Sequence, residues 1–461
     1  MSTARNPPLR HGFRPQTEVP GDIGDSMISL ISRLYPMNRS ITGDGVRETL
    51  RTLTNYIDLR IHEVASGTKV FDWEIPREWN IRGAYIEDSH GNRVVDFDDH
   101  NLHVVGYSTP VNQTMSLEEL RPRLHSLADK PDWIPYRTSY YNDDWGFCLA
   151  HKTLSAMDDG QYKVVIDSTL TDGSLTYGDL LLPGAITDEV IIFAHTCHPS
   201  LCNDNLSGIS LAVHLAAELA KHKTHYSYRF IFAPATIGSI TWLAQNEDNL
   251  KRITGGLVLS VIGDDGPLVY KQSRRSDSEM DKAAEYVLNT HFPDSRIEPF
   301  SPWGYDERQF CSPGINLPVG RLTRTPHGEY PQYHTSADDL SIINAKSLGN
   351  SLLAVWQILG LIENNLSYIN TQPFGEPQLG RRGLYRKLGG YQDVADRQLA
   401  MLWILNQSDG TNSILEIAKK ADMPFDLIRS VADDLVGAAL LRPADTLIDK
   451  SENDQSGGER Q

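Results

Sequence analysis

Residues 194–208, AHTCHPSLCNDNLSG, bring two histidines, two cysteines and an aspartate into one short stretch. His195 directly follows the apolar run EVIIFA, and a segment with helical periodicity starts near Ser207. In open α/β sheets, ligands bind at the carboxyl ends of strands. Zinc takes imidazole nitrogens and carboxylate oxygens as ligands, and catalytic zinc keeps one position open for water. The stretch therefore predicts a metal site that includes His195 and Asp204.

A third ligand is expected far along the chain, in YPQYHTSADDL (330–340). His334 lies in this polar segment, just before a long pattern typical of a helix. Three polar residues that follow it are good N-cap residues, and we expect them to cap that helix: Ser336, Asp338 and Asp339. His198 stays open as the alternative ligand from the first stretch, because a coiled turn would let it chelate a metal together with His195.

Cysteine chemistry is the weaker alternative. Cys197 and Cys202 lack the two-residue spacing of redox and zinc-knuckle motifs. A catalytic thiol also needs a base, which a neighbouring histidine would have to provide. Cys148 and Cys311 are expected to pack in cores.

The order of these motifs resembles the zinc aminopeptidase superfamily, which also contains the glutaminyl cyclases. In those proteins a strand ends in a His-containing turn, an Asp-Asn-x-Ser-Gly loop bridges the metals, and a late Tyr-His-Thr supplies the final ligand. This sequence has His195, DNLSG at 204–208 and YHT at 333–335. The resemblance implies an aminopeptidase-like α/β fold, with His195, Asp204 and His334 as the metal ligands.

The match is closer to a bacterial branch that carries an inserted β domain and a C-terminal winged helix. That branch is encoded near genes for surface polysaccharide or specialised metabolites, which implies a role in biosynthesis. The resemblance extends from about residue 26 to residue 442 and depends on five motifs: YPMNRSITGDGVRETL, AHTCHPSLCNDNLSG, TIGSITWL, DERQFCSPGINLPVG and YHTSADD.

The sequence also departs from the two-metal enzymes of the superfamily. Those enzymes carry Glu-Glu after the second strand, one residue as general base and the other as ligand, whereas Ala235 and Thr236 stand here. Where another metal-binding Asp is usual, this chain has Ser260, and Asp264 is only a weak substitute ligand. One zinc ion is therefore the expected cofactor.

The segment WGYDERQF resembles the superfamily's Ser-Asp-His-x-x-Phe, in which the Asp contacts the amino end of the substrate. We carry that role over to Asp306. Glu307 is the candidate general base or additional ligand, because a carboxylate near a metal-bound water can take its proton. An ion pair between either acid and Arg308 is the alternative.

Three further residues are assigned to the substrate. Arg321 and Arg324 precede the His334 loop and suit bidentate binding of a carboxylate or phosphate. Tyr333, next to His334, is expected to contact the substrate as well. Solvated loop arginines are the alternative for both guanidinium groups.

The elements that must position these residues follow an α/β rhythm from about residue 162, which predicts a mostly parallel central sheet flanked by helices. YKVVIDSTL and LTYGDLLLPG are expected to pair as a hairpin. Short alternating segments broken by turn residues predict a separate antiparallel β unit. The predicted boundaries are a mobile arm at 1–24, an α/β domain at 25–63 and 115–370, an inserted β domain at 64–114, a winged-helix-like module at 380–443 and a disordered tail at 444–461.

The C-terminal module raises DNA binding as a rival function. Its expected recognition helix, PFDLIRSVADDLVGA, carries three aspartates against Arg429, and the whole chain has a net charge of −17. Phosphate contact needs clustered positive charge. We therefore expect a protein-interaction or dimerisation element and no nucleic acid partner.

Composition places the protein in the cytoplasm, because the N-terminus has no apolar signal region and no apolar run is long enough to span a membrane. The expected activity is zinc-dependent hydrolysis of an amide or peptide bond in a small aminoacyl or acyl-amide substrate. Two alternatives to hydrolysis remain open. One is a non-hydrolytic metal-binding sensor with a degenerate site, and the other is acyl transfer of the kind that glutaminyl cyclases carry out.

Overall fold

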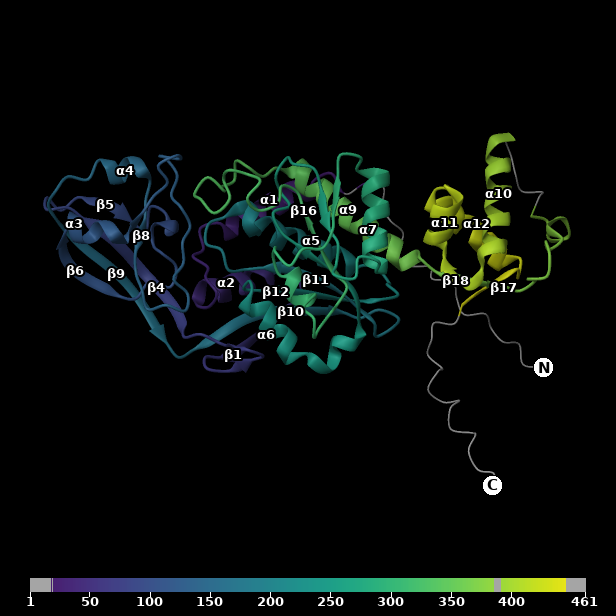
Figure 1. The fold of residues 1–461 in the computed structure, drawn as a ribbon, viewed down its shortest axis with the longest axis horizontal. Helices are drawn as coiled ribbons and strands as arrows, with labels where there is room; N and C mark the ends of the chain where they lie inside the picture. Colours follow the sequence, from purple (N-terminus) through teal and green to yellow (C-terminus); the bar gives the residue numbers. More distant parts are fainter. Residues whose placement is uncertain (1–17, 19, 385–390, 445–461) are drawn as a thin grey trace, which may run out of the picture. The chain divides into compact units, whose positions relative to one another are not determined.

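The computed structural model describes residues 18, 20–384 and 391–444. Most of the predicted mobile arm and nearly all of the predicted tail lie outside the described residues. The chain divides into two compact units, one up to Gly360 and one from Leu361. Figure 1 shows the course of the chain, and each unit is described by itself.

An eight-stranded sheet is the centre of the first unit. Its strand order is β1-β10-β12-β11-β13-β16-β14-β15. The strands are β1 (Arg60–Ala65), β10 (Ser174–Leu182), β11 (Glu189–His195), β12 (Ser227–Ala233), β13 (Ile253–Leu259), β14 (Val269–Lys271), β15 (Arg296–Glu298) and β16 (Val319–Thr323). The four pairings β11–β12, β11–β13, β13–β16 and β14–β15 are parallel, and β1–β10, β10–β12 and β14–β16 are antiparallel. The predicted α/β fold is confirmed, and its sheet is mixed.

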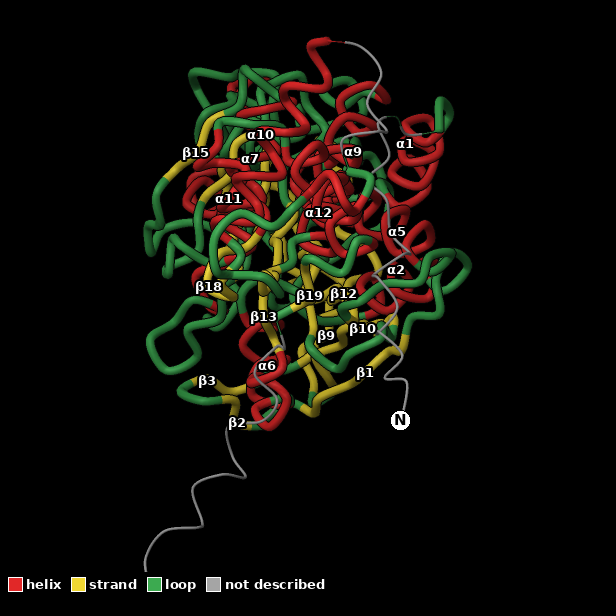
Figure 2. The backbone as a smooth tube through the Cα atoms, turned by 90° about the vertical axis from the view of Figure 1, so that its right-hand side faces the viewer, coloured by secondary structure: helices red, strands yellow, loops and turns green. Residues whose placement is uncertain are grey.

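The middle of the sheet is covered on both faces. Every residue of β11 is buried, as its continuous apolar sequence requires. Helix α5 (Gly208–Leu219) contacts β11, β12 and β13, and α1 (Ile23–Leu34) packs on α5. Alternate side chains of β11, Ile191 and Phe193, join a core cluster with α6 (Ile237–Gln245). Strands of this sheet appear in yellow among red helices in Figure 2.

The described residues of the first unit also form the helices α2 (Asp44–Leu53), α3 (Leu117–Leu120), α4 (His151–Ser155), α7 (Glu279–His291) and α8 (Glu307–Phe310). Helix α9 (Ala345–Asn364) follows them. Among the described residues, α9 is the one helix long and apolar enough to cross a membrane, yet 72% of its apolar window is buried inside the protein. A mostly buried helix of this kind is typical of a protein core, so it is no clear sign of a membrane protein.

The inserted β domain is larger than the sequence predicts. Its sheet has the order β5-β4-β9-β6, with β4 (Glu78–Glu87), β5 (Arg93–Asp96), β6 (Val111–Ser116) and β9 (Gln161–Thr171). Two short pairs accompany it, β2 (Lys69–Val70) with β3 (Trp73–Glu74) and β7 (Leu124–His125) with β8 (Phe147–Cys148). Because β9 pairs with both β4 and β6, the domain extends far beyond residue 114.

The predicted hairpin between residues 162–170 and 175–184 does not form. Strand β9 pairs within the inserted sheet, whereas β10 pairs with β1 and β12 of the central sheet. Burial explains the separation, because β9 alternates buried and exposed residues while most of β10 is buried on both faces.

The second unit confirms the predicted winged-helix module. Helices α10 (Tyr391–Gln407), α11 (Ile414–Ala421) and α12 (Phe425–Gly437) accompany a three-stranded sheet of order β18-β17-β19. The strands are β17 (Ser367–Asn370), β18 (Asp409–Ser413) and β19 (Leu441–Pro443). Strand β17 precedes the predicted start at residue 380, so the module starts earlier in the chain than the sequence predicts.

Candidate metal centre

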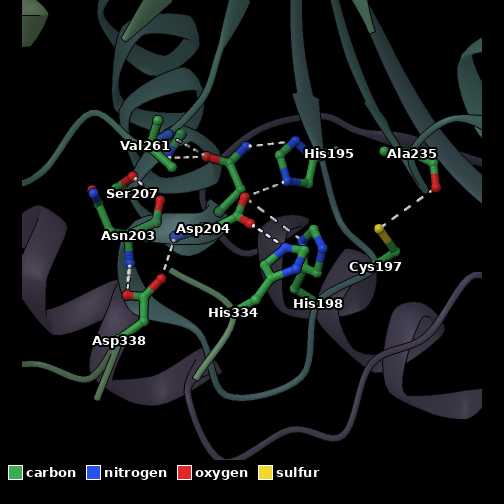
Figure 3. Close-up of polar contacts among 12 residues, drawn as sticks. His195, Cys197, His198, Asn203, Asp204, Ser207, Ala235, Val261, His334 and Asp338 are labelled. Atoms are coloured by element: carbon green, nitrogen blue, oxygen red, sulfur yellow. Dashed lines mark hydrogen bonds and ion pairs between the residues drawn. The ribbon is translucent and has the colours of Figure 1, made fainter. Parts of the chain in front are cut away.

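Four of the predicted ligands meet beyond the end of β11. His195 is the last residue of that strand, and Asp204 lies in the irregular turn Cys202–Ser207 that leads into α5. His195 Nε2 is 2.9 Å from Asp204 Oδ1, and His334 Nε2 is 3.0 Å from Asp204 Oδ2. His198 Nδ1 lies 3.7 Å from Asp204 Oδ1. The structure therefore brings His198 into the cluster together with His195 (Figure 3).

The chemistry of this donor set fits a metal ion. The candidate ligand atoms of His195, His198 and Asp204 all lie within 4.8 Å of one another. His198 Nδ1 is buried and has no hydrogen-bond partner in the described part of the chain. Burial lowers the pKa of His198 to about 3, so its imidazole stays neutral and keeps a lone pair. A neutral imidazole beside an ionised carboxylate is the form that zinc requires.

Asp204 is fully buried, and its neighbours favour the ionised form of its carboxyl. Burial favours the protonated acid, but the surrounding imidazoles outweigh it and hold the pKa of this carboxyl well below its usual value. His334 is the most accessible member of the cluster, with 33% of its side chain exposed, against 11% for His198. The cluster is therefore reached from solvent on the His334 side.

Neighbouring groups fix the orientation of the imidazoles. Tyr305 stacks on His195 with ring centroids 5.4 Å apart, and Tyr333 stacks on His334 at 3.9 Å. The Asn205 side chain lies 3.3 Å from His195 Nδ1 and also accepts hydrogen bonds from two backbone amides, those of Gly208 and Val261. The sequence predicts that Tyr333 contacts the substrate. In the structure its ring lies against His334, which is a candidate metal ligand.

Asp338 joins the two ligand loops, a role that the sequence did not reveal. Its carboxylate accepts hydrogen bonds from the backbone amides of Asn203 (2.6 Å) and Asp204 (3.0 Å). Burial raises the pKa of Asp338 to about 8. The prediction that this residue caps the following helix is wrong, because α9 starts at Ala345 and Asn344 Oδ1 accepts the amide of Ser347 instead.

The structure does not bring Asp264, the weak candidate ligand, into the cluster. Its carboxylate accepts hydrogen bonds from Asn203 Nδ2 (2.8 Å), Thr325 Oγ1 (2.6 Å) and the amide of Gly266 (2.7 Å). These bonds occupy both oxygens and tie three loops together. Asp264 therefore stabilises the loop of Asp204 through its hydrogen bond with Asn203.

The two adjacent acids, Asp306 and Glu307, have different surroundings. Both are fully buried. Ser239 Oγ donates to Asp306 Oδ1 over 2.6 Å, while Asp306 Oδ2 has no partner among the described residues. Burial raises the pKa of Asp306 to about 6. Glu307 Oε1 instead accepts a hydrogen bond from Lys271 Nζ over 2.8 Å.

The two arginines assigned to substrate lie apart from each other. Arg321 Nη1 is 3.7 Å from Glu307 Oε1, and its guanidinium lies 5.6 Å from the centre of the Tyr305 ring, so it borders the site. Arg324 points elsewhere. Its guanidinium donates to Ser351 Oγ and to the carbonyls of Gly266 and Ser347, so it links β16 to α9.

The thiols carry no sign of catalytic activation. All four cysteines are free and buried. Burial raises the pKa of Cys197 to about 12, and its Sγ lies 3.8 Å from the carbonyl oxygen of Ala235. Cysteine nucleophiles require a lowered pKa, so the arrangement favours metal chemistry.

Comparison with solved structures places the fold. A zinc aminopeptidase from Bacillus subtilis is 14% identical, with a TM-score of 0.55, covering 73% of this chain and 94% of that one. A crystal structure from Clostridium acetobutylicum, provisionally named a peptidase, is 49% identical with a TM-score of 0.86, covering 92% of this chain and 97% of that one. The likeness shows that this chain has an aminopeptidase-like fold.

The family follows from the sequence matches. Residues 28–365 match the family described as "Domain of unknown function (DUF4910)", and the chain belongs to that family. Residues 366–443 match a winged helix-turn-helix family. A Clostridium acetobutylicum relative is 50% identical over 421 residues, which are 91% of this chain and 97% of the relative. It is provisionally named a polysaccharide biosynthesis protein with an aminopeptidase-like domain.

Proposed function

We propose that this protein is a zinc-dependent hydrolase of an amide or peptide bond. One observation carries the proposal: a fully buried aspartate, Asp204, faces three imidazoles, and one of them, His198, has a buried Nδ1 with no hydrogen-bond partner among the described residues. The relatives support the reaction class, because similar structures include a named zinc aminopeptidase. His195, Asp204 and His334 would hold one zinc and leave one position open for water, with His198 as the alternative histidine ligand.

A bound zinc supplies a Lewis acid and lowers the pKa of a coordinated water. The chain itself supplies the group that takes the proton. Each acid has one oxygen without a partner among the described residues, Asp306 Oδ2 and Glu307 Oε2. Asp306 suits this task better, because Glu307 is paired with Lys271 whereas burial raises the pKa of Asp306 to about 6 and lets it exchange a proton near neutral pH. Its Oδ1 is held by Ser239. We therefore assign the general base to Asp306.

Glu307 acts as a positioning residue in this proposal. Lys271 and Arg321 hold its Oε1 from two sides, and Lys271 Nζ also donates to the Trp303 carbonyl over 2.6 Å. These contacts fix the 303–307 segment, which carries both Asp306 and the Tyr305 ring that stacks on His195. Glu307 thus orients the base and a ligand through the backbone.

The test measures zinc content and amide hydrolysis together. Purified wild-type protein, His334→Ala and the surface control His90→Ala are dialysed against zinc, analysed for bound metal, and assayed on a panel of aminoacyl and acyl amides. We expect one zinc per chain and turnover in the wild type and the control, and neither in His334→Ala. Wild-type protein without bound zinc would overturn the proposal.

A second candidate is a metal-binding protein without hydrolytic activity. Ala235 and Thr236 favour it, since they occupy the stretch after β12 where the resembling enzymes carry Glu-Glu. The same panel assayed with wild-type protein and Ala235→Glu separates the two. Zinc without turnover in the wild type, with turnover gained in Ala235→Glu, supports this second candidate.

A further inference from the structure

The inserted β domain is attached to the loop that carries His334. The backbone amide of Tyr136 donates to the His334 carbonyl over 2.9 Å, and the amide of Ser336 donates to the Ile134 carbonyl over 2.8 Å. Lys130 Nζ donates to the carbonyl of Pro331 over 2.6 Å. Residues 130–140 of the inserted domain therefore lie directly along the loop that supplies a metal ligand.

A row of aromatic side chains extends outward from this contact. The Tyr136 ring centre lies 5.2 Å from that of His198 and 5.1 Å from that of His334, both nearly perpendicular. We define the aromatic strip by four residues: Tyr136, Tyr140, Tyr141 and Trp73. The hydroxyls of Tyr136 and Tyr140 are 3.0 Å apart, the rings of Tyr140 and Tyr141 are 6.5 Å apart, and those of Tyr141 and Trp73 are 5.7 Å apart.

The outer half of the aromatic strip is open to solvent. The exposed fractions are 50% for Tyr141 and 42% for Trp73. Asn142 and Asp143 follow Tyr141 directly and are exposed, and Arg77 pairs with Asp143. Large exposed aromatics in contact with one another mark binding surfaces more often than isolated ones do.

We propose that the aromatic strip binds a sugar ring of the substrate, so that the hydrolysed amide belongs to a sugar derivative. This inference rests on the proposed hydrolase function. Ring and hydroxyl contacts connect Tyr141 and Trp73 through Tyr140 and Tyr136 to His198 and His334, so a sugar ring on the outer half of the strip would direct the rest of its molecule toward the cluster. The inserted β domain then serves as the specificity element of the enzyme.

The composition of the strip favours a sugar over an apolar side chain. A pyranose has C–H faces that stack on aromatic rings and hydroxyls that need hydrogen-bond partners at the edge. Tyrosine and tryptophan present both an apolar face and a polar edge, and the two residues after Tyr141 add an exposed amide, Asn142, and an exposed carboxylate, Asp143, which pairs with Arg77. An apolar side chain is better accommodated by a concave apolar pocket, whereas these two rings are half exposed.

The experiment uses the zinc-loaded full chain and two probes, the disaccharide N,N′-diacetylchitobiose and phenylalanine amide. Saturation-transfer difference NMR identifies the bound protons, and titration gives the Kd. We expect saturation at the ring C–H protons of the disaccharide. Trp73→Ala and Tyr141→Ala should each raise its Kd by about 3- to 10-fold. The matched control is Phe374→Ala, which removes a fully exposed aromatic side chain from the second unit.

The results separate this inference from the proposed function. Zinc binding and amide turnover without disaccharide binding would overturn the inference alone. Disaccharide binding that depends on Trp73 and Tyr141, without zinc or turnover, would overturn the hydrolase and leave the sugar site standing. A Kd unchanged in both variants, or binding of phenylalanine amide only, contradicts the inference. Thermal unfolding of each variant shows whether the fold is intact.

Discussion

Two buried carboxylates, Asp204 and Glu307, lie within one site and receive different partners. Asp204 is surrounded by three imidazoles, while Glu307 accepts a hydrogen bond from Lys271 and lies near Arg321. An ammonium or guanidinium group has no lone pair to give, whereas a neutral imidazole has one. Glu307 Oε1 therefore already has cationic partners that offer no donor atom to a metal, although Glu307 Oε2 has no hydrogen-bond partner among the described residues. The imidazoles around Asp204, together with its carboxylate, offer several donor atoms to a metal cation.

Asp204 and Glu307 show that the type of partner, more than burial, distinguishes a candidate metal site from a structural ion pair. Both acids are fully buried. A buried charge must be paired or coordinate a metal, and these two acids satisfy that condition by different means. Four predictions test the contrast, from the largest expected effect to the smallest.

Exchange of the two acids for their amides should produce opposite results. Asp204→Asn removes the anion on which the imidazoles converge, and we expect zinc affinity to fall by more than about 100-fold, together with activity. Glu307→Gln should retain stoichiometric zinc. Competition titration with a chromophoric chelator measures both. Zinc lost from the Glu307 variant and kept by the Asp204 variant would reverse the comparison.

Asp306 directly precedes Glu307 in the sequence, and its substitution should affect the catalytic rate alone. Asp306→Asn is expected to lower kcat by about 10²- to 10⁴-fold and to leave zinc content unchanged. Because burial raises the pKa of Asp306 to about 6, the base is ionised above that pH and wild-type activity should fall as the pH drops through it. A bound cation favours the ionised form and moves this limb to lower pH.

The pH–rate profile of the Asp306 variant supplies the control. Residual activity of Asp306→Asn should lack the acidic limb seen in the wild type. A limb that persists unchanged in the variant assigns the titration to another group and argues against Asp306 as the base.

Removal of a cation from Glu307 should affect folding more than metal binding. Lys271→Met leaves a fully buried carboxylate with only the more distant Arg321, and the expected loss is about 3 kcal/mol in the free energy of unfolding. Urea unfolding measures it. The double variant Lys271→Met/Glu307→Gln should recover most of the loss, since it leaves no unpaired charge. An unstable double variant would mean that Lys271 stabilises by packing.

The smallest effect is expected at Arg324. Its hydrogen bonds go to α9 and to the Gly266 carbonyl, so Arg324→Lys should cost about 1–2 kcal/mol of stability and leave KM unchanged. Arg321→Lys is the matched comparison, because Arg321 borders the site. A rise in KM for the Arg324 variant would restore the predicted role of that residue in substrate binding.

Sequence alone singled out the residues of the His/Asp cluster because each of them carries a local signal. His195 ends an apolar run, Asp204 begins DNLSG, and His334 is the centre of YHT, two short motifs that the resemblance assigns to metal binding. Asp338 and Tyr136 gave no such signal. Asp338 resembles a helix cap, and its partners are backbone amides more than a hundred residues away. Tyr136 lies in an irregular segment whose position depends on the docking of the inserted domain.

Fold prediction failed where pairing depends on long-range burial. The strands at 161–171 and 174–182 were recognised, but their assignment to one hairpin was wrong because each pairs in a different sheet. Alternation indicates that a segment is a strand and says nothing about its neighbour. For the same reason the inserted domain was predicted too short, since its long strand β9 follows a stretch without periodicity.

The bonds from Asp338 to the loop of Asp204 have a consequence for folding. They join residues 135 and 134 positions apart in sequence, and β12, β13 and β16 lie between them in the chain. Contacts of such separation form only after the intervening strands have assembled. We therefore expect the metal centre to be among the last parts of the first unit to take shape, so that zinc capture during refolding reports completion of the sheet.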